Sequence, residues 1–253
     1  MVLCLFFSCS DKNKTKIDVS NIKVNFSIKR YDVDFYNAAE ETLPNVKEKY
    51  PYLFPESFSD SLAIAKINDK EEQELFAETQ KKYKDFSDLE SQLTTLFKNI
   101  KYYNSKFKSP DIVTILTNID YDSRVIYADS LLFISLDVYL GKEHSFYTDY
   151  PKYIKENNTK ENIIVDVANS VIKTQFHSYR NRSFINKIIS EGKKLYLLDK
   201  YLPDVSDNLK IGYPIDKLNW AIENEEQVWK YFVEKKILLV IVQFMNLRLR
   251  TFH

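Results

Sequence analysis

The 253-residue chain is poor in glycine and histidine and nearly free of cysteine, and each shortage excludes a class of protein. Its three glycines form neither GxGxxG nor GxxxxGK(S/T), the loops whose glycines let backbone approach phosphate. His144, His177 and His253 are too widely spaced for HExxH, which places two zinc ligands on one helix face. We therefore expect no phosphate-binding loop, no resident metal and no cofactor.

Two further shortages concern partners and membranes. Lys and Arg total 36 and so do Asp and Glu, so the basic excess typical of nucleic-acid binding is absent, and we expect no nucleic-acid partner. Cys4 and Cys9 lie in the first nine residues, which leaves no disulfide framework for the rest of the chain. Beyond the opening stretch, no apolar run reaches the roughly 18 residues that a membrane-spanning helix needs.

The opening residues MVLCLFFSCSDKNKTK pass abruptly from apolar to polar. An apolar stretch, the small Ser8, Cys9 and a polar run follow one another as at the end of a bacterial lipoprotein signal, although this apolar stretch is short and no basic residue precedes it. We expect residues 1–9 to be the remnant of such a signal, with lipid on Cys9, and residues 10–22 to be a tether. The alternative is a short hydrophobic N-terminal strand.

Apolar periodicity predicts one α+β domain over residues 23–236, predominantly helical with a small β-sheet. Aromatic residues make up 15% of the chain, enough for a substantial core. A strand-like alternation over residues 131–141 puts aliphatic side chains on one face and Ser135, Asp137 and Tyr139 on the other. The expected strands are 22–36, 111–117, 124–128 and 131–141, and the expected helical stretches are 35–50, 60–107 with a break near 85–88, 160–176, 183–196 and 215–237.

The last three helices are each expected to bury an apolar stripe. Thr159 and Ser183 are the expected N-caps of the first two, and Gly192 is expected to allow a close approach by another element. Glu225 falls on the stripe of the last helix, so it should be either paired or at the edge of a cavity. The residues expected to face inward are Ile164, Val167, Ala168, Val171 and Ile172; Phe184, Ile185, Ile188, Ile189, Leu195 and Tyr196; and Leu218, Ile222, Trp229 and Phe232.

No catalytic constellation stands out. Counting alone leaves a Ser-His-Asp triad open, but no GxSxG elbow is present to expose a serine. Asp120, Asp122 and Asp129 flank an expected turn, where they could bind calcium or could simply be solvated acids. We therefore assign no catalytic residue.

Three blocks together resemble a known family: DSLLFISLDVYLGKEHSFYTDYPKYI (129–154), SEGKKLYLLDKYLPD (190–204) and IGYPIDKLNWAIENEEQVWKYFVE (211–234). They are similar to the gliding-motility lipoprotein family GldB of the Bacteroidota, over about residues 20–236. The resemblance implies a cell-envelope lipoprotein required for surface gliding, a process coupled to type IX secretion. Its expected partners are a membrane, through the N-terminal lipid, and unidentified gliding or secretion proteins, with inner and outer membrane both open.

That family more remotely resembles zinc-protease-like proteins, which implies a degenerate zincin-like scaffold without its metal. The metal helix would fall at residues 163–171, where this chain has IIVDVANSV, and an acidic Glu-Gly helix would fall near Glu191. We expect the cleft to be reused for binding, in a non-catalytic assembly or scaffold protein. The alternative is an envelope hydrolase with an unrecognised site. The candidate cleft residues are Asp166, Asn169, Ser170, Glu191 and Glu225.

The last residues depart from the family pattern. The family is expected to continue for several dozen residues after Lys236, whereas residues 237–253 read ILLVIVQFMNLRLRTFH, without an acid, and then stop. We expect a truncated or frame-shifted reading frame, the alternative being a genuine C-terminal strand or helix.

Overall fold

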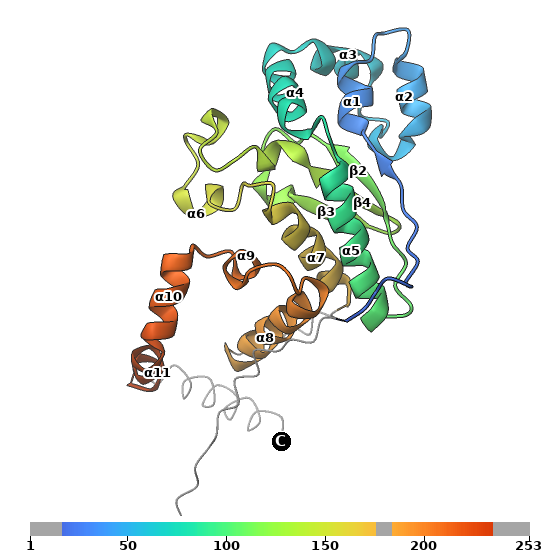
Figure 1. Ribbon diagram of the computed structural model, residues 1–253. Coiled ribbons are helices and arrows are strands. Elements are labelled where there is room, and N and C mark those ends of the chain that lie inside the picture. Colours follow the sequence, from blue (N-terminus) through green and yellow to red (C-terminus); the bar gives the residue numbers. More distant parts are fainter. Residues whose placement is uncertain (1–16, 176–183, 235–253) are drawn as a thin grey trace, which may run out of the picture.

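The computed structural model describes residues 17–175 and 184–234 (Figure 1). Cys9, the cap at Ser183, His177 and His253, and the tail 237–253 lie outside these residues, as does most of the expected tether, so the predictions made for them stay predictions. No helix in the described part of the chain is both long and apolar enough to span a membrane.

A small mixed sheet lies at the centre of the fold (Figure 1). Its strands are β1 (Ile28–Lys29), β2 (Asp111–Ile115), β3 (Val125–Ala128) and β4 (Leu131–Ser135), in the order β1-β2-β4-β3. The first three in that order are parallel, with Ile112 beside Leu132, and β3 pairs antiparallel with β4. The predicted α+β class with a small sheet is therefore confirmed.

The strand expected over residues 131–141 ends early, at Ser135. A 3₁₀-helix, η3 (Leu136–Tyr139), follows it, and all four of its residues are buried. The Asp137 carboxylate explains the turn, because its Oδ2 accepts hydrogen bonds from the backbone N–H groups of Thr117 and Ile119 at 3.0 and 2.7 Å. The strand expected over 22–36 is likewise reduced to β1, since the chain enters a helix at Tyr31.

Four helices pack at one end of the sheet: α1 (Tyr31–Tyr36), α2 (Leu43–Lys49), α3 (Asp60–Asn68) and α4 (Lys70–Tyr83). The 3₁₀-helix η1 (Pro51–Leu53) follows α2. Asp69 caps α4 by accepting hydrogen bonds from the N–H groups of Glu71 and Glu72. The fully buried Asp32 joins this end to the sheet, because Arg30, Gln80 and Thr114 all donate hydrogen bonds to its carboxylate.

Helices α5 (Ser87–Tyr103) and α7 (Asn162–Gln175) form the centre of the helical layer. The break expected near residues 85–88 is confirmed, because α4 ends at Tyr83 and α5 begins at Ser87. The stripe predicted for α7 is also confirmed, since all five of its residues are buried. Short segments complete this region: η2 (Tyr121–Ser123), η4 (Ser145–Tyr147) and α6 (Lys152–Lys155).

The C-terminal helices correct several predictions. In α8 (Phe184–Tyr201), which packs on α5 and α7, Leu198 and Tyr201 are buried. The expected inward residues Ile188, Ile189, Leu195 and Tyr196 are instead exposed, and a Cβ at Gly192 would meet nothing within 4 Å. After α9 (Asp207–Ile211), the single helix expected over 215–237 is two, α10 (Ile215–Glu223) and α11 (Glu225–Glu234). Ile222 and Trp229 are exposed on them, because both helices lie away from the core (Figure 1).

Candidate functional site

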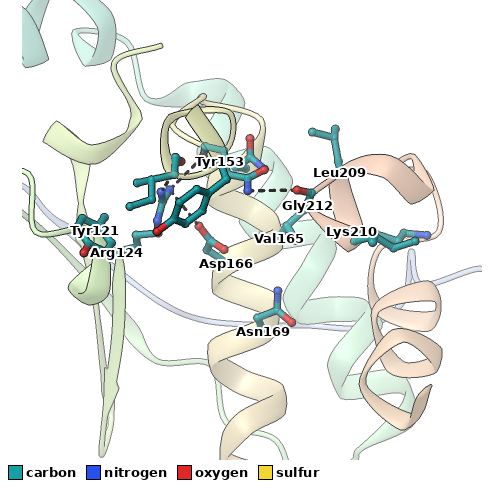
Figure 2. Close-up of a pocket in the computed structure, with 13 residues that line it drawn as sticks. Tyr121, Arg124, Tyr153, Val165, Asp166, Asn169, Leu209, Lys210 and Gly212 are labelled. Atoms are coloured by element: carbon teal, nitrogen blue, oxygen red, sulfur yellow. Dashed lines mark hydrogen bonds and ion pairs between the residues drawn. The ribbon is translucent and has the colours of Figure 1, made fainter. Parts of the chain in front are cut away.

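A pocket of about 360 Å³ opens between α6, α7 and the C-terminal end of α9 (Figure 2). Residues far apart in the sequence meet there, from the turn before β3 to the residues after α9. The lining side chains and backbone belong to Tyr121, Arg124, Tyr153, Ile154, Asn157, Asn162, Val165, Asp166, Asn169, Leu209, Lys210, Ile211 and Gly212.

One face of α7 forms the floor of the pocket. Asp166 and Asn169 are three residues apart, so they lie one above the other on this face (Figure 2). Val167 and Ala168, between them in the sequence, are fully buried in the core. The apolar stripe that fixes α7 against the core therefore also aims the two polar side chains outward.

Asp166 lies in a polar but partly dehydrated setting. The Tyr139 hydroxyl donates a hydrogen bond of 2.7 Å to Asp166 Oδ2, and Arg124 Nη1 lies 4.0 Å from the same oxygen. Although 28% of the Asp166 side chain is exposed, burial raises the pKa of its carboxyl. The Tyr139 hydrogen bond and the positive charges of Arg124 and Lys173 act in the opposite direction on that pKa.

Arg124 fixes α6 beside the pocket. Its guanidinium donates to the backbone oxygens of Ile154 and Asn157, at 3.2 and 3.1 Å, and to the side-chain oxygen of Asn158. These acceptors lie at the C-terminal end of α6, where carbonyl groups lack partners within the helix. Most of the donor capacity of Arg124 is therefore used inside the protein.

The opposite wall is formed by the end of α9. Gly212 adopts φ 75°, the left-handed conformation that suits a glycine after a helix, and its carbonyl accepts from Asn157 Nδ2 at 3.3 Å. The Lys210 side chain is 2% exposed, and its Nζ pairs with Asp199 Oδ1 at 2.7 Å. In Figure 2 this side chain extends away from Asp166. These contacts hold the wall in place, and the Lys210 ammonium is already paired within the protein.

The structure brings together two of the five predicted cleft residues, Asp166 and Asn169. Ser170 is buried on another face of α7, where its hydroxyl donates to the Val167 carbonyl. Glu191 is exposed on α8 and pairs with Lys194. Glu225 is exposed at the start of α11, where its Oε1 accepts from Trp229 Nε1 at 3.4 Å. These last three residues therefore do not line this pocket, the two glutamates because their helices turn those faces to solvent.

Sequence reasoning missed the rest of the lining. Arg124 and Tyr153 belong to no recognisable sequence motif. Residues 209–212 reach the pocket only because α8 and α9 bring the chain back to α7. The local signal that was available is Gly212, whose place between a helix and Pro214 is typical of a C-terminal cap.

The lining suits binding by hydrogen bonds and ring contacts. Asp166 is the one carboxylate among the described lining residues, which include no serine, threonine, cysteine or histidine. In the described ranges, no group of three or more His, Cys, Asp or Glu side chains is placed to hold a metal ion. Asp166 Oδ1 and the Asn169 amide have no hydrogen-bond partner within residues 17–175 and 184–234.

Comparison with known proteins identifies the family. The family model described as "Gliding motility protein GldB" matches residues 12–246 of the 253. No curated protein and no solved structure matches the chain, so the zincin-like resemblance stays a prediction. Because the family match covers most of the chain, the protein belongs to the gliding motility protein GldB family.

Proposed function

We propose that the protein serves gliding motility as a lipid-anchored, non-catalytic component of the cell envelope, and that the pocket over α7 is its binding site. Family membership supports the link with gliding, and the Cys9 sequence pattern supports the lipid anchor. The pocket itself supports the non-catalytic role. Its carboxylate has a tyrosine and an arginine as neighbours, and no second acid, histidine, serine, threonine or cysteine lines the described pocket beside it.

One observation favours the alternative, an envelope hydrolase. A carboxyl group with a raised pKa in a pocket is a common feature of catalytic acids and bases. Hydrolysis by acid–base catalysis would need Asp166 to exchange a proton with the substrate or with water. A binding site would need only the shape and hydrogen-bonding oxygen of this side chain.

Asp166→Asn separates the two functions, because it keeps the shape and one acceptor oxygen but removes the exchangeable proton. We expect cells that carry only this variant to glide like wild type, with the variant present at the normal level. Asp166→Leu, which removes both oxygens, should impair gliding. Loss of gliding in a well-folded Asp166→Asn protein would favour the hydrolase.

The lipid anchor has its own test. Cys9→Ala, expressed with a complete signal, should abolish palmitate labelling and release the protein into the soluble fraction. The acyl chains should contribute about 0.8 kcal/mol of membrane affinity per buried CH₂ group. Cys4→Ala is the matched control and should label normally, whereas labelling that persists in Cys9→Ala would contradict the anchor.

A further inference from the structure

The groups left free in the pocket define what it can bind. Asp166 Oδ1 offers a hydrogen-bond acceptor, and the Asn169 amide one helical turn away offers both donors and an acceptor. Two tyrosine side chains stand near them with exposed surface, Tyr153 at 76% and Tyr121 at 40%. In Figure 2 Tyr153 lies above Asp166 and Tyr121 lies to one side. A ligand must therefore combine hydrogen-bonding groups with faces that can lie on aromatic rings.

An anionic ligand fits this arrangement poorly. The two cations of the lining, Arg124 and Lys210, already have acceptors within the protein: three oxygens for Arg124, and two carboxylates for Lys210. An anion would also approach the Asp166 carboxylate, and like charges repel each other strongly at short range when partly shielded from water.

A cationic ligand is also disfavoured. Arg124 Nη1 already lies 4.0 Å from Asp166 Oδ2, and Lys173 acts on the same carboxyl, so a further cation would gain less from Asp166 and be repelled by Arg124. A neutral ligand with several hydroxyl groups avoids both difficulties. It can donate to Asp166, exchange hydrogen bonds with the amide and place its less polar ring face on a tyrosine.

The ring of Tyr121 is held in place for such a contact. It packs edge-on against Tyr150, with ring centroids 5.9 Å apart and an interplanar angle of 90°. Tyr153 lies on α6, which the Arg124 hydrogen bonds hold beside the pocket. The volume of about 360 Å³ falls at the small end of small-molecule sites, which span about 300–1,000 Å³. It therefore suits one or two sugar rings.

From this geometry we propose that the pocket binds a neutral saccharide, with Asp166 and Asn169 as its hydrogen-bonding residues and Tyr153 as its ring platform. The inference rests on the proposed function, because it names the ligand class of that same site.

The test is a titration of the full-length protein in detergent with four probes: N,N′,N″-triacetylchitotriose, maltotriose, trilysine and inorganic phosphate. We expect at least one trisaccharide to bind more tightly than trilysine or phosphate. Tyr153→Ala and Asn169→Ala should each weaken that binding at least about tenfold, a free-energy change of about 1.4 kcal/mol. The matched control, Tyr196→Ala, removes a tyrosine that is 62% exposed on α8 and should leave the affinity unchanged.

Three results would overturn the inference: no trisaccharide binds, trilysine or phosphate binds more tightly, or trisaccharide binding survives both pocket substitutions. Thermal melting of each variant verifies that it is folded. Gliding assays keep this inference separate from the proposed function. If Tyr153→Ala and Asn169→Ala lose gliding but no sugar binds, the ligand class is wrong and the site stands. If sugar binds but both of these variants glide normally, the proposed function fails.

Discussion

Helices α7 and α10 both carry apolar side chains at helical spacing, yet only the α7 stripe is buried. Val167, Val171 and Ile172 are at most 1% exposed against α5 and the sheet. On α10, Ile215 is 57% and Ile222 is 64% exposed. An apolar period therefore identifies the face that a helix could bury, whereas the rest of the chain decides whether a neighbour covers it.

The same contrast separates the body of the molecule from its C-terminal part. Apart from Leu198, Tyr201 and Leu202, the buried apolar residues of the described chain lie between Phe35 and Ile172. Most of the exposed large apolar residues follow residue 184. Stability should therefore depend on the body, and substitutions in α10 and α11 should cost little.

The largest loss of stability is expected on substitution of Asp32, which is fully buried where the N-terminal helices meet the sheet. Asp32→Ala should lower the free energy of unfolding by about 3–5 kcal/mol, because it leaves the partly buried Arg30 without its bidentate partner. Urea unfolding measures this change. Asp216→Ala, an exposed aspartate in the first turn of α10, is the control and should change stability little. A small change in stability for Asp32→Ala would show that the hydrogen bonds to the Asp32 carboxylate do not hold the body together.

A matched isoleucine pair compares α7 with α10 directly. Ile172→Ala should cost about 2–5 kcal/mol, since it empties space in the core, whereas Ile222→Ala should change stability by no more than about 0.5 kcal/mol. Equal losses in thermal or urea unfolding would mean that α10 is covered in the native protein.

The buried Asp137 should make the stability of the body depend on pH. Burial raises its pKa to about 6, above the unfolded value of about 3.9. The folded state then holds the proton more tightly, so this group stabilises fully below about pH 4 and loses that contribution as the pH rises through 6. The loss should be about 2–3 kcal/mol. The difference in unfolding free energy between wild type and Asp137→Asn, measured from pH 4 to 7, should show it; a difference independent of pH would contradict the shift.

The smallest effect is expected at Trp229. The helical period favours a buried indole, but this side chain is 47% exposed, so Trp229→Ala should shift stability by only about 0.5 kcal/mol. Its fluorescence offers a second readout in a Trp220→Phe protein, which lacks the other tryptophan of the chain, because an exposed indole is readily quenched by iodide. If Trp229→Ala instead lowered the free energy of unfolding by several kcal/mol, the Trp229 indole would be buried in the native protein.

Sequence patterns predicted the structure correctly where residues close together in the sequence determine it. The break before Ser87 and the α7 stripe both depend on residues within a few turns of one another. The early end of β4 could not be predicted, because it depends on Asp137 receiving hydrogen bonds from a loop some twenty residues earlier.

The site shows the same limit. Asp166 and Asn169 were found through a family resemblance that located the helix, and the helical period then places them on one face. Arg124, Tyr153 and Gly212 join them through contacts that span up to 55 residues, such as the hydrogen bond from Asn157 to Gly212. Glu191 and Glu225 lie outside this pocket and are exposed, because the faces of α8 and α11 that carry them are not covered as the α7 stripe is.

The central claim is that the pocket over α7 carries the protein's part in gliding. The most direct measurement is the gliding of cells in which the Tyr153→Ala, Asn169→Ala double variant replaces the wild-type protein, with its level and melting temperature verified. We predict loss of gliding at a normal level of folded protein. Gliding at wild-type speed under the same conditions would contradict the account.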